Sequence, residues 1–63
     1  MKLTVIDNAN NKTLFNMVVS DNEALSTGLN IAEKRLKDYP NYEKGCYTVI
    51  HSFKGRTLNV FRV

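Results

Sequence analysis

One amphipathic stretch, from Ser20 to Tyr39, is the only segment of this chain with the residue spacing of a helix. Its apolar residues recur at intervals of three and four, as expected for one stripe of a helix. They are Leu25, Leu29, Ala32, Leu36 and Tyr39, with Ala24 and Gly28 widening the stripe. Ser20 and Glu23 have the spacing of a capping box, and Pro40 disfavours helical geometry in the residue before it. We therefore expect one helix, from Ser20 to Tyr39, in which Gly28 permits close approach to a sheet.

Two pairs of segments with alternating apolar residues flank this helix and indicate strands. The expected strands are Lys2 to Ile6, Thr13 to Val19, Cys46 to Phe53 and Thr57 to Val63. An asparagine-rich turn of about four to six residues joins the first pair, and a tight turn at Lys54-Gly55, with or without Arg56, joins the second. The element order predicts one α+β domain over residues 1–63, with the helix packed on one face of a four-stranded sheet.

We expect a β-grasp-like arrangement, in which the first and last strands lie parallel at the centre of the sheet. The element order and the run from Ala32 to Tyr39 resemble the immunoglobulin-binding domains of streptococcal surface proteins. The tryptophan that those domains present to antibody has no counterpart here, because Tyr47 follows Gly45 and Cys46. The resemblance therefore implies an architecture and no activity.

The chain length and the cysteine content limit how the domain is stabilised. With 63 residues and a single cysteine, Cys46, the chain forms no intramolecular disulfide and relies on packing, with or without a partner subunit. The lone thiol and the lack of a recognisable signal peptide favour a reducing, cytoplasmic setting. No apolar run approaches the ~20 residues that span a membrane. A bias toward asparagine, lysine and isoleucine hints at a phage or mobile-element source.

Groups suited to catalysis are few and scattered. Cys46 and His51 lie five positions apart on one expected strand, so they point to opposite faces and form no thiol–imidazole dyad. One cysteine and one histidine do not supply the three or four ligands of a metal site. The three glycines are isolated and form no phosphate-binding loop. We expect no enzyme, no cofactor and no metal.

A single helix covers one face of the sheet, yet the expected strands carry apolar residues on both faces. With a three-residue turn in the second hairpin, one face holds Tyr47, Val49, His51 and Phe53 beside Thr57, Asn59, Phe61 and Val63. A two-residue turn shifts the pairing of the two strands by one residue, so each face of the third strand then lies beside the other face of the fourth. In both registers three or more large apolar groups remain on the uncovered face. Either this face binds a partner or a second copy, or side chains of the two long loops cover it.

The second hairpin also carries the basic part of the chain. Residues 44–63 contain four cations and no acid, whereas residues 1–43 contain five cations and six acids. This asymmetry indicates a docking surface, unless it serves solubility alone. We expect the contact surface to include Tyr47, His51, Phe53, Lys54, Arg56 and Arg62.

The preferred function is a non-enzymatic interaction module, of the accessory or host-modulating type, that binds a protein partner through the sheet face or the second hairpin. A homodimer is one version of this function. The alternative is a nucleic-acid binder, whose bases stack on Tyr47, Phe53 and Phe61 while Lys54, Arg56 and Arg62 hold phosphates. Salt separates these functions, because phosphate contacts release counterions.

Overall fold

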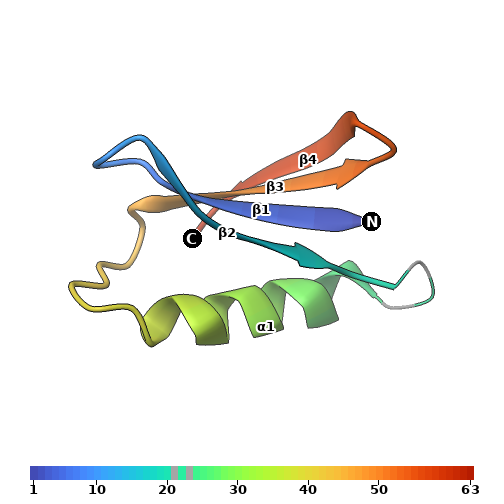
Figure 1. Ribbon diagram of the computed structural model, residues 1–63. Coiled ribbons are helices and arrows are strands. Elements are labelled where there is room, and N and C mark those ends of the chain that lie inside the picture. Colours follow the sequence, from blue (N-terminus) through green and yellow to red (C-terminus); the bar gives the residue numbers. More distant parts are fainter. Residues whose placement is uncertain (21, 23) are drawn as a thin grey trace.

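The chain folds into a four-stranded antiparallel sheet with one helix against one of its faces (Figure 1). The computed structural model of the protein describes residues 1–20, 22 and 24–63. Its elements are β1 (Lys2–Asp7), β2 (Lys12–Val18), α1 (Leu25–Lys37), β3 (Tyr47–Phe53) and β4 (Arg56–Arg62). The predicted α+β class and the order strand, strand, helix, strand, strand are confirmed.

The strands lie in the order β2-β1-β3-β4, and all neighbours are antiparallel. The prediction that the first and last strands are parallel neighbours at the centre was wrong. β3 occupies the place next to β1, with Val5 opposite Val49, and β4 lies at the edge. The composition of the two strands favours this order, because β4 carries Arg56 and Arg62 whereas β3 carries no lysine, arginine or carboxylate. β3 has buried or half-buried residues along nearly its whole length, whereas β4 is exposed at all positions but one. The more apolar strand of the hairpin thus lies between two neighbours.

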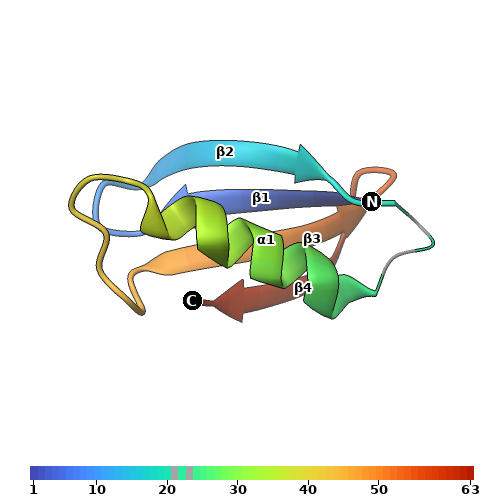
Figure 2. The same ribbon diagram turned by 90° about the horizontal axis from the view of Figure 1, so that it is seen from below.

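The core lies between α1 and the sheet, and α1 crosses that face obliquely (Figure 2). Its buried apolar residues are Leu3, Val5, Val19, Ala32, Leu36, Tyr47 and Val49. Gly28 lies at the closest approach of the two layers. A Cβ atom at Gly28 would lie 3.0 Å from a methyl group of Val19 and 3.2 Å from one of Leu3. The expected role of Gly28 in close packing is therefore confirmed.

The helix is shorter than predicted at both ends. Val19 still belongs to the sheet, because its amide donates to the Met1 carbonyl at 2.8 Å. α1 begins only after Ala24. Of the predicted capping box, Glu23 lies outside the described residues, and the Ser20 hydroxyl accepts from the Asn22 amide at 3.3 Å. The helix ends at Lys37 rather than at residue 39.

The β3–β4 hairpin combines a two-residue turn with a bulge. Lys54 and Gly55 have φ values of 49° and 78°, the left-handed geometry that tight hairpin turns require. A register shift after His51 then leaves Leu58 as an extra residue on β4. Beyond this bulge, His51 pairs with Asn59. The structure therefore has the two-residue turn of one predicted register. Because of the bulge, its strand faces are those predicted for a three-residue turn, with His51 beside Asn59 and Val49 beside Phe61.

The β1–β2 hairpin contains a second irregularity. Its register shifts between Val5 and Ile6, so Leu14 is an extra residue on β2. Sequence alternation predicts that Leu14 shares the face of Asn16, opposite to Phe15. Instead, Leu14 packs against the core together with Phe15. The bulge turns its side chain inward, because an inserted residue breaks the strict alternation of a strand.

Candidate partner-binding surface

The sheet face opposite α1 carries exposed apolar side chains, and we call it the open face. Strand alternation and the observed registers place Ile6, Val18, Ile50 and Val60 there, with Lys2, Thr4, Asn16, Thr48 and Arg62 among the polar members. Val18 is 85% exposed and Val60 is 62% exposed. Ile6 and Ile50, nearer the centre, are half-buried. These apolar residues lie outside the core cluster.

The loop before β3 packs on the helix side rather than over the open face. Its Tyr42 ring stacks on Tyr47, with the ring centres 5.5 Å apart and the planes nearly parallel. Tyr47 itself belongs to the core between helix and sheet. The prediction that loop side chains cover the second face therefore fails for Tyr42.

Two side-chain hydrogen bonds hold the polar residues of the open face. The Thr4 hydroxyl donates to the Asn16 side-chain carbonyl at 2.8 Å, and the Thr48 hydroxyl donates to that of Asn8 at 2.9 Å. Between them, Ile50 faces Thr4 on one side and Val60 on the other. Branched side chains such as these have few rotamers, so little side-chain entropy is lost when a partner covers them. The centre of the open face is thus rigid, largely uncharged and suited to flat apolar contact.

Two of the predicted contact residues, Tyr47 and His51, lie in the core. Tyr47 is 6% exposed, and its hydroxyl accepts a hydrogen bond from the Glu43 amide at 3.1 Å. His51 is 5% exposed, and its ring nitrogens lie 3.1 Å from the Met1 sulfur and 3.2 Å from the Asn59 amide nitrogen. Neither side chain is presented to a partner in the folded domain. The predicted surface was wrong for these two, because their face of the strand is the one that α1 covers.

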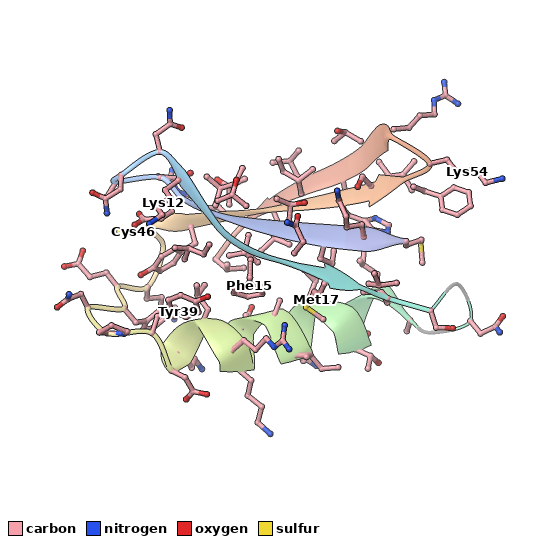
Figure 3. The ribbon with its side chains drawn as sticks, in the orientation of Figure 1. Lys12, Phe15, Met17, Tyr39, Cys46 and Lys54 are labelled. Carbon is pink, nitrogen blue, oxygen red and sulfur yellow. The ribbon has the colours of Figure 1, made fainter. Side chains whose placement is uncertain are left out.

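The other four predicted residues lie at the two ends of β4. At the hairpin turn, the Lys54 ammonium lies 5.4 Å from the ring centre of Phe53, and Arg56 follows directly after Gly55 (Figure 3, Lys54 labelled). Arg62 lies at the far end of the strand, about 20 Å away at ~3.3 Å per residue. Its Nε donates to the Gly45 carbonyl at 2.9 Å. The structure therefore joins Phe53, Lys54 and Arg56 and separates Arg62 from them.

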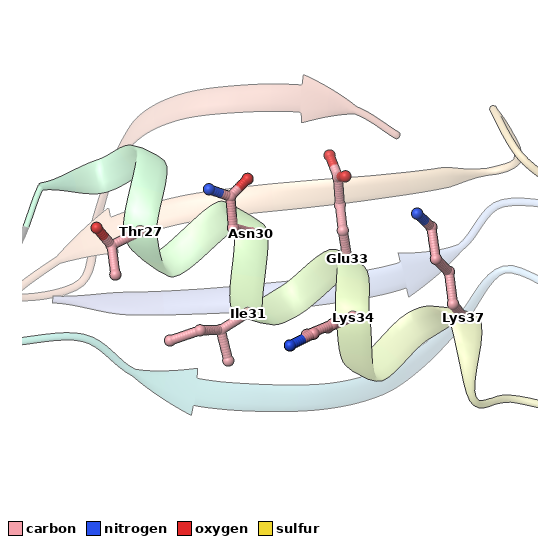
Figure 4. Close-up of a pocket in the computed structure, with 6 residues that line it drawn as sticks. All are labelled: Thr27, Asn30, Ile31, Glu33, Lys34 and Lys37. Atoms are coloured by element: carbon pink, nitrogen blue, oxygen red, sulfur yellow. The ribbon is translucent and has the colours of Figure 1, made fainter.

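The surface hollows of the described residues are shallow or open. One, of about 420 Å³, lies along the outward side of α1, lined by Thr27, Asn30, Ile31, Glu33, Lys34 and Lys37 (Figure 4). All six belong to one helix, so the hollow has no opposite wall. A groove of about 280 Å³ lies between α1 and the end of β4, lined by Glu33, Lys37, Tyr42, Lys44, Arg62 and Val63. We call it the basic groove, because three of these residues are cations.

Other site types find no support in the described part of the chain. There, no three His, Cys, Asp or Glu side chains lie close enough together to hold a metal ion. Within the same residues, no helix has the length and apolar character needed to cross a membrane. Comparisons with protein-family models, curated proteins and solved structures find no match to this chain. A proposal for its function must therefore be based on the geometry of its own surface.

Sequence reasoning missed Val60 and Val18, the most exposed members of the open face. The signal was present, because Val18 alternates with the inward Met17 and Val60 with the inward Phe61. What the sequence lacked was a way to decide which face α1 covers. The aromatic residues drew attention to the covered face, whereas the uncovered one carries smaller β-branched side chains.

Proposed function

We propose that the protein is a non-enzymatic interaction module that binds a protein partner through the open face. The observation that carries this proposal is the exposure of Val60 beside its half-buried neighbour Ile50, on a face without a covering layer. Val18 is a second exposed apolar residue of this face, and Lys2 and Thr4 lie between it and Ile50. Exposed apolar surface on a small domain favours contact with another protein, since water is otherwise left against it. The low charge at its centre resembles the core of protein interfaces, where charged residues are depleted.

The packing of the two most reactive side chains supports the non-enzymatic part. His51 is enclosed and contacts Met1 and Asn59, so its ring contributes to packing at the end of the sheet. Cys46 is half-buried against the core, with its sulfur 3.6 Å from a carboxylate oxygen of Glu43. Both groups have structural partners in place of a substrate cleft.

A matched pair of lysine substitutions tests the open face. Val60→Lys places a charge on this face, whereas Ile31→Lys places the same charge on another exposed branched residue, on the outward side of α1. We expect at least one protein of the producing cells to be captured by the wild type and by Ile31→Lys, and lost with Val60→Lys. Circular dichroism checks that both variants fold. Identical captured proteins for all three would contradict the proposal.

A second copy of the chain is the alternative occupant of the open face. A two-fold dimer buries the same patch of both copies, so an exposed apolar face supports a homodimer as well. Sedimentation velocity over a range of concentrations distinguishes the two. A dimer that Val60→Lys dissociates and Ile31→Lys leaves intact would assign the face to self-association.

Nucleic-acid binding has weaker support from this geometry. Tyr47 lies in the core, and Phe61 packs against it from the same side of the sheet. Phe53 is 36% exposed, and the Lys54 ammonium lies over its ring. The stacking platform that single strands need is thus largely covered. Fluorescence anisotropy with oligonucleotides at low and moderate salt checks this. A loss of affinity of about tenfold or more between ~50 and ~200 mM salt would favour nucleic acid instead.

A further inference from the structure

We propose that the free edge of β4 takes up an extended acidic segment of the partner as an added strand. This inference rests on the proposed function and names the chemistry of the partner that lies beside the open face. Three features carry it: the exposure of β4, the direction of its backbone groups and the charges at its two ends.

β4 is the more accessible of the two sheet edges. It pairs with β3 alone, and six of its seven residues are exposed. On the opposite edge, the β2 residue Phe15 stacks on Tyr39 at 5.8 Å and lies under the Arg35 guanidinium (Figure 3). The helix layer therefore shields part of β2. At β4, α1 borders only the end near Arg62, where the basic groove lies, and the stretch from Leu58 to Val60 is exposed.

The hydrogen bonds at the end of β4 fix which backbone groups point outward. Val63 and Tyr47 exchange both hydrogen bonds, at 3.0 and 3.2 Å. In an antiparallel pair such residues alternate with non-bonded ones, so Phe61 and Asn59 also bond to β3. Val60 and Arg62 consequently direct their N–H and C=O groups toward the free edge. These groups are the template for an incoming strand.

The side chains of β4 define the chemistry of that strand. Leu58 is 50% exposed at the bulge, and Val60 extends the apolar row of the open face to the edge. Arg56 lies at one end of the strand and Arg62 at the other. Lys37 and Lys44 line the basic groove beside Arg62, with Glu33 as the acid of that groove. The complementary segment is apolar in its middle and acidic at both ends.

A second copy of β4 is a poor occupant of this edge. Pairing two copies around Val60, whose backbone groups point outward, places Arg62 opposite Leu58 of the other copy. The two strands would then hold four arginines and no acid. Flanking cations of this kind oppose edge-to-edge association of identical chains. The same cations attract an acidic strand.

The test uses a labelled peptide in which alternating threonine and valine lie between two pairs of glutamates. Fluorescence anisotropy measures the affinity of the protein for this peptide and for two controls. One control has lysines at the four glutamate positions, and the other is an N-methylated acidic peptide that lacks the strand-pairing amides. We expect binding of the first peptide only. In NMR spectra, the amides of Val60 and Arg62 should shift more than those of Asn59 and Phe61.

Two matched variants locate the binding on the protein. Val60→Pro removes an outward N–H, and Val18→Pro makes the same change at the opposite edge, where the bonds between Met1 and Val19 leave the Val18 amide outward. We expect Val60→Pro to abolish binding of the acidic peptide. Val18 belongs to the open face but lies on the opposite edge strand, so Val18→Pro should retain peptide binding whatever it does to a partner that covers the face. Arg56→Gln should weaken binding about threefold, as for an exposed charge pair, and Lys34→Gln on α1 should not. If Val60→Pro does not fold, the N-methylated peptide decides.

Several outcomes would overturn the proposal. Equal affinity for the glutamate and lysine peptides would remove its charge argument, and full binding to Val60→Pro would remove the edge. A dimer that dissociates in Val60→Pro would assign the edge to a second copy. If Val60→Lys loses a cellular partner while no acidic peptide binds, the edge proposal fails and the proposed function stands. If the peptide binds while the captured proteins are indifferent to Val60→Lys, the proposed function fails, and with it the link between this edge and a partner on the open face.

Discussion

At the scale of single residues, Tyr47 joins the sheet to the loop before it. Its ring stacks on Tyr42, its hydroxyl accepts from the Glu43 amide, and its side chain is almost fully buried. We expect Tyr47→Ala to lower the free energy of unfolding by about 3–5 kcal/mol, the usual cost of truncating a buried aromatic residue. A domain of this size has little more than ~3–5 kcal/mol in total, so the variant should be largely unfolded. Urea denaturation followed by circular dichroism measures the effect.

Phe53→Ala is the matched control, because Phe53 is an aromatic residue at the other end of the same strand. It is 36% exposed and contacts Lys54 at the turn. We expect a loss below about 1.5 kcal/mol, since much of its surface already meets water. Equal losses for the two variants would show that Tyr47 does not belong to the core.

The fold lowers the pKa of Asp7. Its carboxylate accepts a hydrogen bond from the Asn10 side chain at 2.7 Å and another from the Ala9 amide at 3.0 Å. These bonds, the Asn10 side chain first, lower the pKa of Asp7 below its ordinary value of 3.8. A lowered pKa in the folded state means that the carboxylate stabilises the turn above pH 3.8, and that this contribution is lost as the pH falls through the folded pKa.

An NMR titration of the Asp7 carboxyl carbon should therefore show a midpoint below 3.8. Asn10→Ala should move that midpoint upward, because it removes the strongest of the hydrogen bonds. A midpoint that stays unchanged in Asn10→Ala would assign the lowered pKa to another cause, such as the nearby Lys12.

At the scale of elements, α1 begins without help from a described side chain. Ala24 occupies the N-cap position, and no acidic residue lies in the first turn. An aspartate there can accept from the free amides and interact with the helix dipole. We expect Ala24→Asp to raise the free energy of unfolding by about 1 kcal/mol. Thermal denaturation measures this gain in stability. Ala9→Asp, the same substitution in the exposed β1–β2 turn, is the control. Equal shifts in the two variants would argue against capping.

The contact between α1 and the sheet predicts that two alanine substitutions in the helix change the free energy of unfolding in opposite directions. Gly28→Ala would place a methyl group against Val19 and Leu3, both buried. We expect a net loss of about 1 kcal/mol, because the overpacking outweighs the gain in helix propensity. Asn30→Ala, on the exposed side of the same helix, should gain a few tenths of a kcal/mol. Chemical denaturation measures both, and a gain in both would show that the layers have room to separate.

Local sequence patterns predicted which helix and strands form. They predicted less well where the helix begins and which strands lie side by side. The Ser20–Glu23 spacing is a local helix-start signal, and the pairing of Val19 with Met1 overrides it. Alternation tells which residues share a face of a strand, and it does not tell which strand lies alongside. The order β2-β1-β3-β4 therefore could not be derived from periodicity. The inserted residues Leu14 and Leu58 were equally hidden, because a bulge leaves the same alternating letters in the sequence.

At the scale of the whole molecule, the strand order predicts a pattern of amide hydrogen exchange. β1 and β3 are paired along both edges, so their amides should exchange slowest. Along β4, the amides of Asn59 and Phe61 should be protected while that of Val60 exchanges quickly. NMR hydrogen exchange on the wild-type protein measures this alternation. Slow exchange at Val60 would instead place β4 inside the sheet, as in the β-grasp-like arrangement.

The candidate surface was predictable only in part at this scale. Sequence reasoning anticipated an uncovered apolar face and a basic second hairpin, and both are present. It placed Tyr47 and His51 on that surface because the helix-covered face of β3 is the one with the larger side chains. Deciding between the two faces requires the packing of α1 against Leu3 and Val49, which involves residues distant in sequence.

The seam between β1 and β3 also has a consequence for how fast the chain folds. Each hairpin joins residues that are near neighbours in sequence, so each can form early. The seam pairs Leu3 with His51 and Val5 with Val49, across the entire helix and both of its loops. Closing so long a loop carries an entropic penalty before any contact rewards it. We therefore expect the pairing of β1 with β3 to be the rate-limiting step of folding, after both hairpins have formed.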